Sequence, residues 1–527
     1  MTNAAAKTMS LGRLLKPLID KSVSKQYSDI LDNITLSGIS QDSRELDKGN
    51  LFIATKGFSC DARNYFNQAL KNSIAAIIAE KEGLEQKVIL IEGYQIKELE
   101  NDVFLLEKNG VSVPLIAVQD LSHNIATLAA RFYRNPTKKM TTIGITGTNG
   151  KTSCCYLTAQ VLEFLQHKTL MLSTIGNGNI EALNKTINTT PSALEIQQKA
   201  AHYLQQKSQY LAMEVSSHGL ELGRVDGINY KVAVFTNLSQ DHLDFHGDME
   251  SYFEAKRKLF LKNSLKSAVI NADDPYGKRL LQDTEITCEK IAYTCQEKDQ
   301  TLNIDKWIFA RNIEFNLTGL SADLETQWGN ARIRSNLIGE FNVSNLLAVA
   351  GTLGALFGDI NRWIVALNEA KAVPGRMHKF SGENKATVIV DYAHTPDALD
   401  KALNTLRKHT KGKLWCIFGC GGDRDNSKRS LMGATAERHA DVVVITDDNP
   451  RSEQPSNIVQ MIKSGMTHDA KYIASRKQAI EYALNNAKAN DMILVAGKGH
   501  ENYQIIGEDI IDYSDLQTVA KLMEVSL

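Results

Sequence analysis

The stretch Met140–Tyr156, MTTIGITGTNGKTSCCY, decides the fold of this chain. The apolar run Ile143–Ile145 is typical of a short buried strand, and the turn Thr146–Thr152 that follows it carries two glycines. Beyond the turn, apolar side chains recur at spacings of three and four residues, which predicts a helix. A strand, a glycine turn and a helix in this order present backbone N–H groups and a helix N-terminus to an anion. The stretch therefore predicts a phosphate-binding loop.

Lys151 and Thr152 give this loop its chemistry. The lysine can reach the terminal phosphates of a nucleoside triphosphate, and the threonine hydroxyl can hold Mg²⁺. The general pattern asks for a glycine five residues before Gly150, where this chain has Ile145. A plain strand-turn-helix corner is the alternative, but Gly-Lys-Thr in this context favours nucleotide binding.

Composition narrows the class of protein. The chain has 527 residues, enough for about three domains of ~100–200 residues each. Its 60 basic and 61 acidic residues give a net charge of -1, so bulk charge does not suggest nucleic-acid binding. Seven cysteines without zinc-ligand spacing indicate reduced thiols. No apolar run approaches the ~18 residues of a membrane span, so we expect a cytoplasmic protein, and we expect it to be a monomer.

The order of apolar and polar segments predicts an α/β fold of three domains. Residues 1–120 predict a small α/β module, in which Val88–Ile91 is a candidate short strand. Residues 121–371 contain the phosphate-binding loop and predict a central ATPase-like domain. Residues 372–527 hold four strand candidates separated by helical patterns, which indicates a doubly wound, Rossmann-like domain.

Two polar positions follow strand candidates of the central domain. Glu214 ends the candidate strand at 209–215, where a second Mg²⁺ contact is expected downstream of a phosphate loop. His242 lies in the polar loop Asp241–Asp248 and is a candidate metal ligand, although a solvated loop is the alternative reading. Lys256 lies on the next helix, and from the residues alone we favour an ordinary surface lysine there.

Each strand candidate of the third domain is followed by a polar loop. Ligands of such sheets bind outside the carboxyl ends of the strands, so we expect these loops to converge on a ligand. The loops are residues 391–394, 419–425, 446–451 and 497–501. In the central domain, Asn271 and Asn345 have amides that suit an adenine edge, with helix capping as the competing account.

These motifs together resemble the Mur ligases, in order and over nearly the whole chain. The matching segments are TGTNGKT, EVSSHGLELGR, TNLSQDHLDFHGDMESYFEAK, GEFNVSN, VPGRM, VDYAHTPDAL, GCGGDRD, DDNPR and GKGHE. TGTNGKT alone would also fit the related folylpolyglutamate synthases, whereas DNPR and GKGHE are more specific. Within the family, the motifs look most like those of the enzymes that add the third peptide residue to the peptidoglycan precursor.

The resemblance implies an ATP- and Mg²⁺-dependent amide ligase of cytoplasmic cell-wall synthesis, a process tied to cell shape and division. The γ-phosphate would pass to the terminal carboxylate of UDP-N-acetylmuramoyl-L-Ala-D-Glu, and the amine of meso-2,6-diaminopimelate would attack the acyl phosphate. Alternatives are the same ligase with lysine as its amino acid, a folylpolyglutamate synthase-like ligase, or an uncoupled P-loop NTPase.

The resemblance also assigns roles to residues. Lys151, His242 and Lys256 would be catalytic, with Lys256 carbamylated. The magnesium positions would be Thr152, Glu214, His242 and the carbamylated Lys256. ATP would be bound by Gly147, Thr148, Asn149, Gly150, Lys151, Thr152, Asn271, Asn345, Arg376 and Asp391. The UDP-linked substrate would be bound by Ser43, Asn188, Thr189, Thr190, Ser216 and Arg224. Diaminopimelate would be bound by Arg424, Asp448, Asn449, Pro450, Arg451, Gly497 and Glu501.

The choice of amino acid has a physical reason. Diaminopimelate is lysine with a second carboxylate, which the planar guanidinium of Arg451 can bind with two parallel hydrogen bonds. Lysine would leave that guanidinium desolvated and unpaired, a penalty that rejects analogues strongly. Glu501 can receive the distal ammonium. The chain departs from the family pattern at Gln41, at Leu222 and in the turn at residues 58–60, which all concern the UDP-linked substrate.

Overall fold

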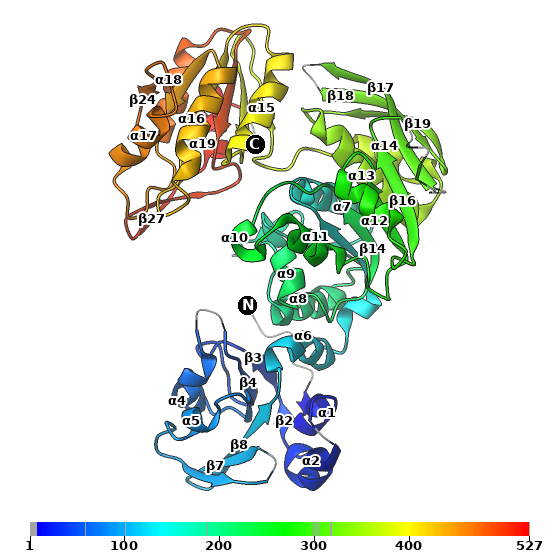
Figure 1. The fold of residues 1–527 in the computed structure, drawn as a ribbon, viewed down its shortest axis with the longest axis vertical. Helices are drawn as coiled ribbons and strands as arrows, with labels where there is room; N and C mark the ends of the chain where they lie inside the picture. The colour runs from blue at the N-terminus through cyan, green and yellow to red at the C-terminus, as the bar shows by residue number, and fades with distance from the viewer. Residues whose placement is uncertain are drawn as a thin grey trace.

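The computed structural model describes residues 8–19, 21–57, 60–100, 102–186, 188–297, 299, 301–302, 304, 306–316 and 319–525. Phe58 and Ser59, two residues of the departing turn, lie outside this range. The chain forms three α/β parts, shown in Figure 1 from blue through green to red. The expected three-domain α/β fold is thereby confirmed, while the bounds at residues 120 and 371 stay a prediction.

The N-terminal part is built on a six-stranded sheet with the order β3-β4-β5-β8-β7-β6. The first four strands are parallel, and β7 and β6 continue the sheet antiparallel. Apolar residues fill both faces of the sheet, because strands such as β4 are buried at every position. The strands are β1 (Met9–Ser10), β2 (Thr35–Leu36), β3 (Gly38–Ser40), β4 (Asn50–Ala54), β5 (Ala76–Glu80), β6 (Gln95–Glu98), β7 (Val103–Lys108) and β8 (Val111–Val118). The helices are α1 (Leu11–Leu15), α2 (Lys21–Gln26), α3 (Ser28–Leu31), η1 (Ala62–Tyr65), α4 (Phe66–Leu70), α5 (Glu85–Val88) and α6 (Leu121–Phe132).

The expected strand at Val88–Ile91 is wrong. Val88 ends helix α5, and residues 89–91 continue in turns that place Val88 and Ile91 in the core while Ile89 and Leu90 stay exposed. The pattern is one of helical turns, with the buried positions three residues apart. The strands of this segment lie further along, in the β6–β7 hairpin.

The central part has an eleven-stranded sheet, ordered β12-β11-β10-β13-β9-β14-β15-β16-β17-β18-β19. Strands β10 to β17 of that order are parallel, and short antiparallel strands close each edge. Strand β9 (Thr141–Thr146) lies between its parallel neighbours β13 and β14, and it leads into α7 (Lys151–Phe164). The phosphate-binding loop therefore leaves the middle of the sheet at the carboxyl ends of its strands, where α/β proteins bind ligands.

The other strands here are β10 (Thr169–Ser173), β11 (Gly176–Asn179), β12 (Ala182–Asn184), β13 (Tyr210–Glu214), β14 (Tyr230–Phe235), β15 (Ser267–Asn271), β16 (Glu289–Thr294), β17 (Lys306–Asn316), β18 (Gly319–Thr326) and β19 (Gly329–Ser335). The other helices are η2 (Pro136–Lys139), α8 (Ala193–Gln205), α9 (Ser217–Glu221), α10 (Leu243–His246), α11 (Met249–Arg257), α12 (Pro275–Gln282), α13 (Phe341–Phe357), η3 (Ile360–Arg362) and α14 (Ile364–Asn368). Two apolar clusters cover the two faces of the sheet, and the most apolar helix, α13, packs on α7 and on strands β14 to β17.

The C-terminal part is the expected doubly wound sheet, ordered β20-β21-β25-β22-β23-β24, in which only β20 is antiparallel. Apolar clusters lie on both of its faces. Its strands are β20 (His378–Phe380), β21 (Thr387–Asp391), β22 (Leu414–Phe418), β23 (Val442–Ile445), β24 (Lys471–Tyr472) and β25 (Met492–Ala496), with a hairpin of β26 (Tyr503–Ile506) and β27 (Asp509–Asp512). Its helices are α15 (Pro396–His409), α16 (Ser427–His439), α17 (Pro455–Lys463), α18 (Arg476–Asn486) and α19 (Asp515–Met523).

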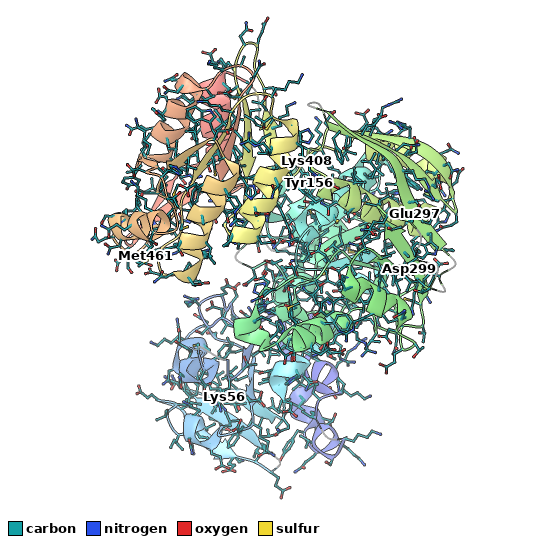
Figure 2. The ribbon with its side chains drawn as sticks, turned by 45° about the horizontal axis from the view of Figure 1, so that its top comes forward. Lys56, Tyr156, Glu297, Asp299, Lys408 and Met461 are labelled. Atoms are coloured by element: carbon teal, nitrogen blue, oxygen red, sulfur yellow. The ribbon has the colours of Figure 1, made fainter. Side chains whose placement is uncertain are left out.

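Helix α15 also contacts the central part. Lys408 Nζ lies 2.7 Å from Glu340 Oε2, and the rings of His409 and Phe315 meet edge to face at 6.2 Å. Figure 2 shows Lys408 on the side of the C-terminal domain that faces the central sheet. These contacts join the two domains at a point distant in sequence from the chain crossing near residue 372. Among the described residues, no helix is long and apolar enough to cross a membrane, and all seven cysteines are unpaired.

Candidate active site

The phosphate-binding loop is fastened to the segment that follows β14. Thr148 N donates to Asn237 O at 2.8 Å, and Asn149 N donates to the Asn237 side chain at 2.9 Å. Thr236 Oγ1 donates to Asn149 O at 2.6 Å. Gly147 adopts φ 145°, and a Cβ there would come within 1.9 Å of Thr236 Oγ1, so only glycine fits. Thr236 and Asn237 are site residues that sequence reasoning missed, although the Thr-Asn pair directly after a strand was visible.

Three cations surround this loop. Lys151 Nζ donates to Gly147 O at 2.9 Å and to Thr148 O at 2.8 Å. Lys256, 1% exposed, donates to Gly147 O at 2.9 Å and lies 4.5 Å from the centre of the Tyr252 ring. Burial lowers the pKa of both lysines, that of Lys256 far below its ordinary range, and the neighbouring charge of Lys151 lowers it further. The preference of the residues alone for a surface lysine at 256 is therefore wrong.

Arg376 is the third cation, and it comes from the C-terminal domain. Its charge acts on Lys151 and on Glu214, whose pKa values it lowers, so its guanidinium lies within electrostatic reach of the loop. The guanidinium stacks 4.6 Å from the centre of the Tyr392 ring, and its Nε is buried without a hydrogen-bond partner. A buried orphan donor within electrostatic reach of Lys151 is suited to an incoming anion.

Glu214 is the carboxylate at this site. It is fully buried at the end of β13, and its two oxygens accept from Thr174 N at 2.9 Å and Thr174 Oγ1 at 3.3 Å. Burial raises its pKa, while the charge of Lys151 and a hydrogen bond from Thr152 favour its ionised form. A hydroxyl and a carboxylate at the base of a phosphate loop are the hard oxygen donors that Mg²⁺ takes, so these residues fit that ion.

His242 lies at the edge of the same region. Its Nε2 is 3.3 Å from Asp241 Oδ2, and its ring lies edge to face with that of His218. Among the described ranges, no three His, Cys, Asp or Glu side chains gather closely enough to form a metal cluster. The predicted role of His242 as a ligand stays a prediction.

Asn271 and Asn345 have partners within the protein. Asn271 Nδ2 donates to Thr236 O at 2.7 Å, and its Oδ1 accepts from Asp273 N. Asn345 Nδ2 donates to Asn342 Oδ1 at 3.0 Å. Neither caps a helix, because Asp274 caps α12 and Asn345 lies inside α13, so the capping alternative is wrong. Their predicted contact with adenine stays a prediction.

A second group of predicted residues lies next to Glu214. Thr190 Oγ1 donates to Glu214 O at 3.0 Å, and Thr190 accepts hydrogen bonds from Ser216 N and from Arg224 Nη1. The Thr189 hydroxyl lies 3.2 Å from the hydroxyl of Thr174, the residue whose backbone N–H donates to Glu214. Asn188 is exposed nearby in sequence. Ser216 also caps α9 by accepting from Gly219 N.

Ser43 lies apart from that group, in the N-terminal domain. Its hydroxyl donates to Gln68 at 3.0 Å. It lines a cavity of about 790 Å³ between the N-terminal sheet and the start of α8, whose wall includes Arg44, Tyr65 and Lys199. The cavity shows that the N-terminal and central domains share a surface large enough for an extended ligand.

The polar loops of the C-terminal domain converge as expected. Gly497 N donates to Asp391 O at 3.1 Å, and Gly497 has φ 113°, where a Cβ would come within 2.9 Å of Asp448 Oδ2. Burial raises the pKa of Asp391, which accepts from Met377 N through Oδ2 and feels the charge of Arg376. This loop edge therefore joins the Arg376 side of the site to the amino-acid loops.

Arg451 and Arg424 lie beside the same edge. Arg451 Nη1 donates to Gly422 O at 2.7 Å, and the Gly421 position lies between the Arg451 and Arg424 side chains. Pro450 precedes Arg451 in the loop and is buried. Arg424 is exposed. Burial and the charge of Glu501 raise the pKa of Tyr503, while the charges of Arg451 and Arg424 lower it, so two cations and a carboxylate lie near one ring. Asn449 Nδ2 donates to Glu501 Oε2 at 3.3 Å. We call this group of loops the amino-acid pocket.

Lys498 is a further residue that sequence reasoning missed. It is fully buried and donates to Asn449 Oδ1 and to Glu501 Oε2, both at 3.0 Å. The sequence feature that could have indicated it is a lysine between two glycines directly after a strand. It lies in the motif GKGHE, whose first glycine and glutamate were already predicted to bind the amino acid.

The fold and the site together define a three-domain protein in which a P-loop domain and a doubly wound domain both contribute basic side chains to one centre. The Mur ligase family models match all three parts: the Mur ligase family catalytic domain at residues 35–133, the Mur ligase middle domain at 145–353, and the Mur ligase glutamate ligase domain at 375–499. The chain belongs to the Mur ligase family.

Individual relatives span the whole chain. A protein of Coxiella burnetii (strain RSA 493 / Nine Mile phase I), named UDP-N-acetylmuramoyl-L-alanyl-D-glutamate–2,6-diaminopimelate ligase, is 39% identical over 97% of this chain and 100% of its own length. A solved structure of a ligase with the same name is 32% identical, with a TM-score of 0.68 over 98% of this chain and 99% of that one. A folylpolyglutamate synthase of Mycobacterium tuberculosis, at 17% identity and a TM-score of 0.60, covers 77% of this chain and shares its fold.

Proposed function

We propose that this Mur ligase joins 2,6-diaminopimelate to UDP-N-acetylmuramoyl-L-Ala-D-Glu at the expense of ATP. The relatives that carry this name match the chain from end to end, whereas the folylpolyglutamate synthase covers a smaller share of it. The observation that carries the proposal is the edge where Gly497 N donates to Asp391 O. It connects the Arg376 side of the phosphate site to the pocket of Arg451 and Glu501.

Each step of the proposed reaction can be assigned to residues of the chain. The amides of Gly147–Thr152 and the ammonium of Lys151 hold the ATP phosphates, and Arg376 adds a cation from the opposite domain. The terminal carboxylate of the UDP-linked substrate attacks the γ-phosphorus, and ADP leaves. The amine then attacks the acyl carbon, and inorganic phosphate leaves as the amide forms. Closure of the C-terminal domain onto the central domain excludes water from the acyl phosphate during these steps.

Mg²⁺ bound at Thr152 and Glu214 would neutralise charge on the transferring phosphate. Lys256 suits the expected carbamylation, because burial lowers its pKa and so makes its amine easier to deprotonate. A neutral amine is the form that adds CO₂. The carbamate would supply the anionic oxygen that this cation-rich centre lacks. His242 would contribute from the loop beside it.

Recognition of the amino acid follows from the charges of the pocket. Arg451 and Arg424 would bind the distal carboxylate, and Glu501, with Asp448 and Asn449, would bind the distal ammonium. The UDP-linked substrate would extend from Ser43 across the cavity at α8 to Thr189, Thr190, Ser216 and Arg224. We place the reaction in the cytoplasm, where ATP and nucleotide-linked precursors are found, and we propose that the chain acts as a monomer.

The test is phosphate release by the purified chain with ATP, Mg²⁺ and UDP-N-acetylmuramoyl-L-Ala-D-Glu. Three parallel reactions contain diaminopimelate, lysine or no amino acid. Release with diaminopimelate alone is the expected result. Equal kcat/KM with lysine would discard the account of Arg451, and release without any amino acid would indicate an uncoupled NTPase. A parallel reaction with a folate and glutamate tests the folylpolyglutamate synthase alternative.

A further inference from the structure

Lys498 occupies the centre of the amino-acid pocket. Its side chain is 0% exposed, although lysine is among the residues least often buried. Gly497 and Gly499 flank it with φ values of 113° and 52°, so the loop bends in the left-handed region on both sides of the lysine. The ammonium lies among the loops that carry the predicted ligand contacts.

The Lys498 ammonium connects two separate loops. From the loop after β23 it takes Asn449 Oδ1 at 3.0 Å and Asp448 Oδ1 at 3.5 Å, and from its own loop after β25 it takes Glu501 Oε2 at 3.0 Å. Asn449 Oδ1 also accepts from Ile505 N, which adds the β26 hairpin to the same junction. One side chain therefore sets the relative positions of three segments.

The same contacts orient the carboxylate of Glu501. Its Oε2 accepts from Lys498 and from Asn449 Nδ2 at 3.3 Å, so that oxygen is held by the protein. Among the residues that the structure describes, its Oε1 accepts from the Tyr392 hydroxyl alone, at 3.5 Å, which is a long contact. A ligand ammonium can therefore bind Oε1 without displacing a strong internal hydrogen bond.

Charge balance requires the lysine as well. Asp448 and Glu501 are two carboxylates that contact one ammonium, 3.5 and 3.0 Å away. With Lys498 the cluster of three side chains carries a net charge of -1, which suits one ligand cation. Without it, two carboxylates would share a mostly buried space with no cation between them, and like charges would drive them apart.

We propose that Lys498 is the positioning residue of the amino-acid pocket. It fastens the loop after β23 to the loop after β25 and presents Glu501 Oε1 to the distal ammonium of the incoming amino acid. The identity of that amino acid rests on the proposed function, whereas the geometry of Lys498 does not. Lys498 reaches the ligand only through Glu501 and Asn449.

The test compares steady-state kinetics of three variants with the wild type. Lys498→Met removes the charge and the hydrogen bonds at similar length, and Lys498→Gln keeps a donor without the charge. Lys477→Met, at an exposed lysine of the same domain, is the matched control. We expect the KM for diaminopimelate to rise about tenfold or more in Lys498→Met, as for a lost charge-assisted hydrogen bond. The KM values for ATP and for the UDP-linked substrate stay within about twofold.

A double-mutant cycle shows whether Lys498 acts through Glu501. In a Glu501→Gln background, the added Lys498→Met change is expected to raise the KM for the amino acid by less than about threefold, because the coupled partner is already lost. Full additivity of the two changes overturns the proposal. So does an equal rise in all three KM values, which marks a general loss of structure.

An error in the proposed substrate can be told apart from an error in the proposed role of Lys498. If the wild type releases phosphate with lysine and not with diaminopimelate, the proposed substrate is wrong, and the same variants are compared with lysine, whose side-chain ammonium takes the place of the distal one. If Lys498→Met is recovered unfolded, the cycle is run with Lys498→Gln, whose KM for the amino acid is expected to rise by about threefold to tenfold. An unchanged KM in that variant overturns the positioning role.

Discussion

The nucleotide loop and the amino-acid pocket both bury lysines, but they treat the charge in opposite ways. At the nucleotide loop, the ammonium groups of Lys151 and Lys256 donate to the carbonyls of Gly147 and Thr148. In the amino-acid pocket, Lys498 contacts two carboxylates. Burial lowers the pKa of both lysines at the loop.

The difference lies in what each buried lysine contacts. At the nucleotide loop the lysines donate to backbone carbonyls, and the phosphates of ATP would supply the negative charge that pairs with them. In the amino-acid pocket, Lys498 already pairs with Asp448 and Glu501, and the three side chains together carry a net charge of -1. We therefore expect substitutions at the loop to affect catalysis more than folding, and substitutions of Lys498 to affect both.

The largest expected effect is that of Lys151→Ala. The loss of a cation aimed at the transferring phosphate lowers kcat by about a thousandfold, the range for one electrostatic group at a reacting centre. Thermal unfolding of the ligand-free variant stays within a few degrees of the wild type, because no buried carboxylate loses a direct ion-pair partner. A large drop in melting temperature would remove the contrast between the two sites.

Substituting one buried lysine in each site shows directly how much each lysine stabilises the fold. Lys498→Met leaves Asp448 and Glu501 without their cation and lowers the free energy of unfolding by about 3 kcal/mol. Lys256→Met removes one hydrogen bond to a carbonyl and costs about 1 kcal/mol or less. Urea unfolding of both variants in bicarbonate-free buffer gives the two values. Equal losses would show that the two lysines are held in the same way.

Arg376→Ala tests the contribution of the C-terminal domain to the nucleotide site. Its guanidinium acts on Lys151 and Glu214 and stacks on Tyr392, so its loss is expected to lower kcat by about tenfold. The Kd for ADP stays within about twofold, because the loop of the central domain is intact. Isothermal titration with ADP and single-turnover phosphate release provide the two readouts. A weakened ADP complex with unchanged kcat would contradict the closure mechanism.

The smallest effect concerns pH. Burial lowers the pKa of Lys256 in the folded chain below its ordinary value of 10.5. At a pH between the pKa of the folded chain and that of the unfolded chain, Lys256 therefore binds its proton more fully in the unfolded chain. The free energy of unfolding therefore rises with pH in this window, and Lys256→Met reduces the slope. Chemical denaturation in bicarbonate-free buffers from pH 7 to pH 10 measures it. Identical slopes in both proteins would argue against a low pKa for Lys256.

Local sequence patterns predicted the elements that position the site. The phosphate loop, strand β9 and helix α7 follow from spacing and glycine chemistry alone. The strands of the C-terminal domain are continuous apolar runs, because both faces of that sheet are buried. The wrong strand at Val88–Ile91 shows the limit of such patterns, since a short apolar run fits a turn of helix as well as a strand.

Local sequence patterns could not predict the buried polar contacts between segments that are distant in the chain. Nothing in the sequence around Lys256 shows that its side chain lies under the phosphate loop, and the residues alone favoured a surface position. Lys498 is a similar case, because its partners lie some fifty residues away in the chain, at Asp448 and Asn449. The β17–β19 meander also needs the tertiary structure to be placed, since it extends a parallel sheet with antiparallel strands.

The contact between α15 and the central domain has a mechanical consequence. The C-terminal domain meets the central domain at the covalent crossing near residue 372, at Ile338, which is buried in the C-terminal core, and at the pair Lys408–Glu340 with the neighbouring ring contact of His409 and Phe315. The covalent link and the apolar contact persist at any ionic strength. The ion pair is exposed and contributes about 0.2–1 kcal/mol, which salt screens. Raising the ionic strength thus loosens the α15 side of the domain contact by at most about 1 kcal/mol.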